Sequence, residues 1–184
     1  LGSDQRTGLQ ALKPETKLVA SKSPAGVLAG PVDGLRPGDA AKWGGRSANY
    51  GLVRKGTPTA TPPAAALSLD LWDAFLSQQV QGTTLRAAID ARVSRHTWPP
   101  SDRALLLADL AAVRELILTQ AALTPAQRQA IEGALSGFTP TLPVEVQPST
   151  NVADTLEHGA PGLYRGAVGC LADDLDADAV GPSA

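Results

Sequence analysis

The chain has 184 residues, 43% of them hydrophobic and 18% charged, with a formal net charge of −2. This hydrophobic content excludes wholesale disorder, and the near-neutral charge gives no general attraction to nucleic acid or to a membrane surface. The single cysteine excludes an internal disulfide, and no stretch of roughly 18 apolar residues predicts a membrane span.

Residues 1–40 are rich in Gly, Pro, Ser and Asp, which predicts an extended arm. No basic segment precedes an apolar run at the N-terminus, so the sequence shows no signal peptide. The chain starts at Leu1 and contains no Met, which we interpret as a processed product, an engineered piece or a fragment of a longer polypeptide. Terminal segments need anchors, and we expect the arm to cross the domain surface or reach a neighbouring copy in a homo-oligomer. The expected anchors are apolar: Leu18, Val19, Val27, Leu28 and Leu35.

A glycine turn at 43–47 comes next, and Ser47 is a plausible N-cap for a short helix that reaches Val53. Prolines in 55–63 exclude helix there, and 64–67 can form a short buried strand. Ser68 opens a helix whose apolar face carries the residues Leu71, Trp72, Phe75, Leu76 and Val80.

Three further helices are predicted from caps and apolar stripes. The first restarts at Thr83 or Thr84, the second covers about 102–119, and the third begins with a capping box at Thr124. A short strand follows at 144–146. We therefore expect an α+β fold, with the last two helices packed on one another and on a small mixed sheet. Leu110 and Ile131 should lie buried between them.

Two loops have the residue types of an anion site. The turn Gly44-Gly45-Arg46 combines backbone freedom with a cation, and the loop 147–151 follows a strand. Glycines let the backbone approach a ligand, and successive amides make a concavity for anions. An ordinary turn with a solvated arginine has the same pattern, so the spacing alone leaves both interpretations open.

Six segments between residues 40 and 170 carry motifs in a definite order: GGRSANYGL (44–52), TPPAAALSLDLWDAFL (61–76), AAVRELIL (111–118), LTPAQRQAIEGAL (123–135), VEVQPSTNVAD (144–154) and GAPGLY (159–164). In this order they resemble the N-terminal part of the PEP/pyruvate-binding domain. That domain is the ATP-grasp-type nucleotide-binding domain of PEP synthase, pyruvate phosphate dikinase and their relatives. The resemblance divides the chain into the arm 1–40, a partial PEP/pyruvate-binding-like domain 41–170 and an acidic tail 171–184.

The resemblance implies binding of ATP and Mg²⁺, with a lysine and an arginine of the family on the ATP phosphates. The lysine position is Arg46, and the arginine position is the neutral Gln147. The first serine of that motif is Pro148, which has no N–H to donate. The implied nucleotide-binding residues are Gly44, Gly45, Arg46, Ser149, Thr150 and Asp154. Because the phosphate motif is degenerate, we expect ATP affinity no better than on the order of 100 μM.

Other candidates have simpler interpretations. His96 is expected to be a surface or capping histidine, and His158 an ordinary loop residue. The acidic residues of the tail do not match an EF-hand: Asp173, Asp174, Asp176 and Asp178. Ser149 lacks a motif for a nucleophile.

The sequence is compatible with two functions. One is the nucleotide-binding part of a PEP/pyruvate-dikinase-type phosphotransferase that works with the remainder of a longer polypeptide. The other is a non-catalytic binding or structural module that keeps the fold and has lost the phosphate site. The resemblance implies a cytoplasmic location, while the sequence does not exclude secretion.

Overall fold

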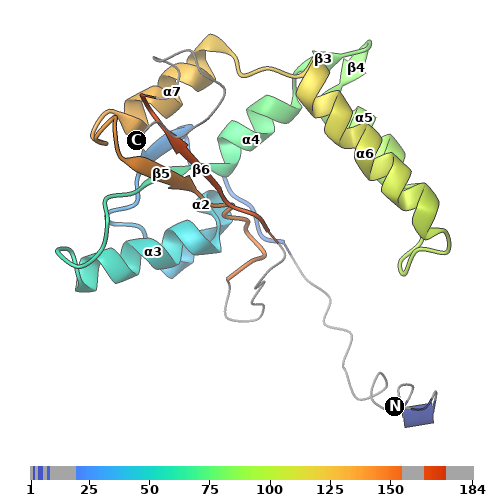
Figure 1. The fold of residues 1–184 in the computed structure, drawn as a ribbon, viewed down its shortest axis with the longest axis horizontal. Coiled ribbons are helices and arrows are strands. Elements are labelled where there is room, and N and C mark those ends of the chain that lie inside the picture. Colours follow the sequence, from blue (N-terminus) through green and yellow to red (C-terminus); the bar gives the residue numbers. More distant parts are fainter. Residues whose placement is uncertain (1, 3, 6–7, 9–19, 155–163, 173–184) are drawn as a thin grey trace.

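The computed structural model describes residues 2, 4–5, 8, 20–154 and 164–172. Within them the chain is an α+β fold, shown in Figure 1, whose elements follow in the order β1 (Ala29–Pro31), η1 (Pro37–Asp39), α2 (Ala40–Trp43), α3 (Gly45–Gly56), β2 (Ala65–Leu67), α4 (Leu69–Leu76), β3 (Gln79–Val80), β4 (Thr83–Thr84), α5 (Leu85–Val93), α6 (Arg103–Gln120), α7 (Pro125–Leu135), β5 (Pro143–Val146) and β6 (Ala167–Cys170).

The strands form three separate antiparallel pairs: β1 with β2, β3 with β4, and β5 with β6. The prediction of one small mixed sheet is therefore wrong for the described residues. The strands are two to four residues long, and pairs of this size need support from helices. For β1–β2 that support comes from α7, which packs against both strands.

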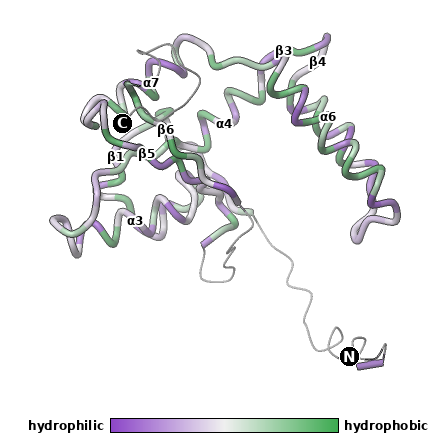
Figure 2. The backbone as a smooth tube through the Cα atoms, viewed as in Figure 1, coloured by the Kyte–Doolittle hydropathy of each residue, from purple (hydrophilic) through white to green (hydrophobic). Residues whose placement is uncertain are grey.

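Two apolar clusters hold the described residues together. One joins α4, β3, α5 and α6 through the residues Leu76, Val80, Leu85, Ala88 and Leu116. The other joins the residue after β1 to α2 and β2 through Val32, Trp43 and Ala66. Leu85 has no exposed surface, which makes it the most deeply buried large aliphatic side chain of the first cluster. In Figure 2 hydrophobic residues recur along α6, interrupted by hydrophilic ones.

Three of the helices begin at a residue whose side chain caps the first turn. Thr84, Asp102 and Thr124 each accept a hydrogen bond from a first-turn amide through their side chains, and Thr124 completes a capping box with Gln127. Ser68 occupies the predicted N-cap position of α4, although its hydroxyl donates to the carbonyl of Val27. The helices at these four positions are confirmed, except that α4 ends at Leu76 and Val80, predicted on its apolar face, lies in β3.

Ser47 differs from its prediction. The cap of α3 is Gly44, and Ser47 lies in the first turn of the helix. The turn therefore ends earlier than expected, because Gly44 adopts a φ of 79° and a ψ of 156°, a conformation open to glycine almost alone. This shift places Gly45 and Arg46 inside the helix.

The long helices do not pack on one another as predicted. α6 packs mainly against α5, whereas α7 packs against β1 and β2, and Figure 1 shows the α5–α6 hairpin at the far end of α4 from α7. Leu110 is 45% exposed, so its predicted burial is wrong, and Ile131 is only partly buried. The error arises because α6 carries leucines on both faces, and periodicity cannot say which face meets a partner.

Residues 20–40 are integrated in the fold. The carboxylate of Asp70 accepts the amides of Ala25 and Gly26 at 2.9 and 2.8 Å, and Ser23 donates to the carbonyl of Ala41. Leu35 packs against the second cluster and Leu28 is partly buried, whereas Val27 is 52% exposed and is wrong as an anchor. Leu18 and Val19 lie outside the described residues.

Candidate functional site

The two loops singled out from the sequence lie against each other. We call residues 44–47 and 147–154 together the α3 junction. The amide of Gly45 donates to the carbonyl of Thr150 at 2.9 Å, across 105 positions of sequence. The amide of Ser47 donates to Ser149 Oγ at 2.9 Å. The start of α3 and the loop after β5 are therefore one structural unit.

Ser149 connects this unit to the apolar core. Its hydroxyl donates to the carbonyl of Trp43 at 3.0 Å while it accepts the amide of Ser47. Trp43 is 8% exposed and belongs to the cluster beneath β1 and β2. Both hydrogen-bonding capacities of this hydroxyl are thereby used in positioning the loop, which agrees with the interpretation of Ser149 as a loop serine.

The two glycines are explained by contacts within the chain. A Cβ at Gly44 would overlap the carbonyl and side chain of Ser149, and a Cβ at Gly45 would overlap the carbonyl of Ala153. Glycine at these positions therefore lets the loop approach the helix. The space beside the two glycines, where the sequence pattern predicts a ligand, is therefore partly occupied by the loop 147–154.

Arg46 is the cation of the junction. Its Nε lies 3.1 Å from Asp154 Oδ2, and its Nη1 donates to Gln147 Oε1 at 2.6 Å. The side-chain Nε2 of Gln147 in turn donates to the carboxylate of Glu145. The side chains of Arg46 and Asp154 are 36% and 31% exposed, so solvent and solutes reach both groups. An exposed pair of this kind contributes little to stability, in the range of about 0–1 kcal/mol.

The backbone around Asp154 is held in place. Its φ of 55° lies in the left-handed region, which aspartate tolerates better than most residues. Its carbonyl accepts a hydrogen bond from the side-chain Nδ2 of Asn49 at 2.7 Å, and Thr150 Oγ1 accepts the N–H of Ala153. These bonds fix the turn that presents the carboxylate to Arg46.

Two contributors to the junction had no role assigned from the sequence. Asn49 lies one turn after Gly45 on α3, so helix periodicity could have placed it beside the loop. Asn151 donates to the carbonyl of Ser21 at 2.7 Å, a contact between distant segments that no local pattern signals. The six residues implied by the resemblance are all brought to this junction: Gly44, Gly45, Arg46, Ser149, Thr150 and Asp154.

The junction does not fit a resident divalent cation. Asp154 is its only carboxylate apart from Glu145, and the two are engaged by Arg46 and Gln147. Across the described ranges no group of three or more His, Cys, Asp or Glu residues could hold a metal ion.

A second polar cluster lies at the α5–α6 turn. The buried carboxylate of Asp109 pairs with Arg95 and lies 2.7 Å from His96 Nε2. The His96 side chain is 4% exposed, so its prediction as a surface or capping histidine is wrong. The hydrogen bond from Arg95 holds the pKa of Asp109 below its usual value. His158 and the acidic residues from Asp173 onward lie outside the described residues.

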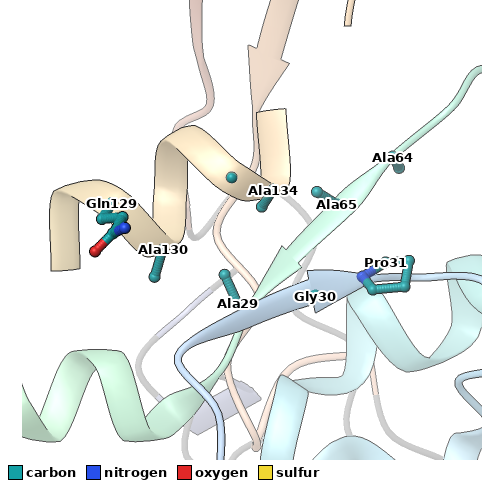
Figure 3. A pocket seen from close by; sticks show the side chains of 9 residues that line it. Ala29, Gly30, Pro31, Ala64, Ala65, Gln129, Ala130 and Ala134 are labelled. Atoms are coloured by element: carbon teal, nitrogen blue, oxygen red, sulfur yellow. The ribbon is translucent and has the colours of Figure 1, made fainter. Parts of the chain in front are cut away.

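Two surface hollows lie away from the junction. One of about 380 Å³ is lined mostly by small residues of β1, β2 and α7, and Figure 3 shows Ala130 and Ala134 on α7 beside Ala29 and Ala65 on the two strands. The other, of about 600 Å³, lies between the 33–37 turn and the end of α3. There Arg54 is 14% exposed and bonded to Asp33, and this hydrogen bond lowers the pKa of Asp33. These hollows lack the paired loops found at the junction.

Comparison with family models, with curated proteins and with solved structures finds no match to this chain. The resemblance to the PEP/pyruvate-binding domain therefore stays an expectation from the sequence. In the part of the chain that the structure describes, no helix combines the length and apolar character needed to cross a bilayer.

Proposed function

We propose that this chain is the nucleotide-binding part of a PEP/pyruvate-dikinase-type phosphotransferase and receives the phosphate end of ATP at the α3 junction. One observation carries the proposal. Two segments about a hundred residues apart in sequence, each resembling a phosphate-contacting motif of the family, meet around the partly exposed guanidinium of Arg46.

In this proposal each residue has a distinct task. Arg46 binds phosphate oxygens through its planar fork, a geometry suited to bidentate contacts. The N-terminal end of α3 adds the positive end of a helix dipole beside the same anion. Ser149, Thr150 and Asn49 hold the loop in position and do not themselves react. The chemistry supplied by bound ATP is phosphoryl transfer, in which the protein contributes positioning and charge stabilisation.

A second candidate has its own supporting observation. The amides of Gly45 and Ser47 already donate to oxygen atoms of the loop, and Arg46 is already paired with Asp154. This internal satisfaction favours a non-catalytic module that keeps the fold and binds a neighbouring domain or subunit. The two candidates differ in one measurable property, the binding of ATP.

Calorimetric titration with ATP decides between them. We expect wild-type protein to bind with a dissociation constant on the order of 100 μM or weaker, because the second phosphate-binding position carries neutral Gln147. Arg46→Gln should abolish this binding. Arg86→Gln is the matched control, since Arg86 is also an exposed arginine paired with an aspartate. Equal binding by wild type and Arg46→Gln, or no binding by wild type, would contradict the proposal and favour the non-catalytic module.

A further inference from the structure

Asp154 occupies the position of a ligand at the α3 junction. Its Oδ2 lies 3.1 Å from Arg46 Nε, where a phosphate oxygen would bind the same guanidinium. Carboxylate and phosphate oxygens compete for arginine because both accept its N–H groups in the same planar geometry. We propose that Asp154 limits the anion affinity of this site and selects for ligands with two or more linked phosphoryl groups. This inference rests on the proposed function.

The competition is local and direct. Gln147 Oε1 accepts a hydrogen bond from Arg46 Nη1 at 2.6 Å, so Gln147 and Asp154 share one guanidinium. The Asp154 backbone is pinned by Asn49, and its carboxylate is therefore presented to Arg46 by a fixed turn. Both side chains are about one-third exposed, so an incoming anion reaches the pair without opening the apolar core.

The preference for polyphosphates follows because a ligand must replace the Asp154 carboxylate at Arg46. A ligand with one anionic group replaces the Asp154 carboxylate by a similar acceptor, so the exchange yields little binding free energy. The ligand still loses translational and rotational freedom on binding. A ligand with linked phosphoryl groups brings more negative charge to the same cation. Its additional oxygens can also accept from Arg46 Nη1 in place of the neutral Gln147 amide oxygen. Such a ligand displaces Asp154, while inorganic phosphate does not.

The test compares Asp154→Asn with Asp73→Asn. The Asp73 side chain is 35% exposed and pairs with Lys22 and Arg86, so its substitution makes the same charge change and releases cations elsewhere. Each protein is titrated with inorganic phosphate, pyrophosphate and ATP, without added metal. Asp154→Asn should bind pyrophosphate and ATP about tenfold tighter than wild type, and Asp73→Asn should not. The gain should vanish in the double variant Arg46→Gln/Asp154→Asn.

The outcomes separate this inference from the proposed function. Wild type that binds ATP, with no tighter binding by Asp154→Asn, overturns the role of Asp154 and leaves the proposed function standing. Equal gains in Asp154→Asn and Asp73→Asn overturn it as well, because they indicate a general charge effect. A gain for pyrophosphate with no additional affinity for ATP supports the role of Asp154 and counts against nucleotide recognition. If no variant binds any of the three anions, both proposals fail.

Discussion

Gly44 lies so close to Ser149 that any side chain at Gly44 would overlap the Ser149 backbone. The contact joins the turn before α3 to the loop after β5, and the same loop bonds to Gly45 and Ser47. The close approach of these two backbone segments therefore forms the candidate site and places Arg46 beside Asp154.

Replacing Gly44 tests this assembly. Gly44→Ala introduces a Cβ against a backbone and imposes a φ of 79° that alanine rarely adopts. The conformational strain alone costs about 1–3 kcal/mol, and overpacking adds a similar amount. Urea denaturation should therefore show a loss of stability in this range or above. Gly56→Ala is the control, because Gly56 ends α3 with open space around it, and it should leave stability nearly unchanged.

The α5–α6 cluster should depend on Leu85. Leu85→Ala removes a side chain with no exposed surface from the centre of that cluster, which costs about 2–5 kcal/mol. Leu107 is 55% exposed on α6, and Leu107→Ala should change stability by about 0.5 kcal/mol or less. Similar losses for the two variants would show that the packing described for α5 and α6 is incorrect.

Acid should weaken the α5–α6 turn through Asp109. The hydrogen bond from Arg95, with a further contribution from His96, holds the pKa of Asp109 below its usual value. A carboxyl of this kind stabilises the fold above its unfolded pKa of about 3.9 and loses that contribution as pH falls through its folded pKa. The urea midpoint of wild type should therefore fall steeply below about pH 4.

Two variants check the assignment. Asp109→Asn should be less stable at neutral pH and show a flatter profile in acid, because it no longer loses a charge there. Asp90→Asn changes an exposed aspartate on α5, and its urea midpoint should fall in acid as steeply as that of wild type. If the urea midpoint of Asp109→Asn falls in acid as steeply as that of wild type, other carboxyls cause the loss of stability.

Asp70 should fasten residues 20–28 to the domain. Its Oδ2 accepts two backbone amides, those of Ala25 and Gly26. Hydrogen bonds to a charged group are worth about 1.5–3 kcal/mol, so Asp70→Ala should lower stability by at least that amount. Asp70→Asn keeps one oxygen acceptor and should lose less. Hydrogen exchange at Ala25 and Gly26 should speed up in the alanine variant, and unchanged exchange would contradict the role of Asp70.

The sequence predicted elements better than their packing. Caps such as Thr124 and Asp102 are local, so a few neighbouring residues determine where the helix begins. The burial of Leu110 depended on which partner α6 meets, and the pairing of β5 with β6 required a strand that had not been predicted. These outcomes depend on long-range contacts that periodicity does not encode.

The candidate site shows the same division. Gly44, Arg46 and Ser149 could be selected from the sequence as residues of an anion loop. That they lie near one another was expected only from the resemblance of six ordered segments to one family. In the structure Gly44 contacts Ser149, and Arg46 bonds to Gln147 and Asp154 of the same loop. The pairing of Arg46 with Asp154 was not predicted, because a charge in one loop gives no indication of its counter-ion in another.

The most direct test of the account is an amide NMR titration of the wild-type protein with ATP. Binding at the α3 junction should shift the amide resonances of Gly45, Arg46 and Ser47 together with those of Gln147 and residues 149–154, since the two segments share hydrogen bonds. Resonances of Leu52 and Lys55, which line the separate hollow at the other end of α3, should not change. Shifts confined to that hollow, or no shifts at millimolar ATP, would contradict ATP binding at Arg46.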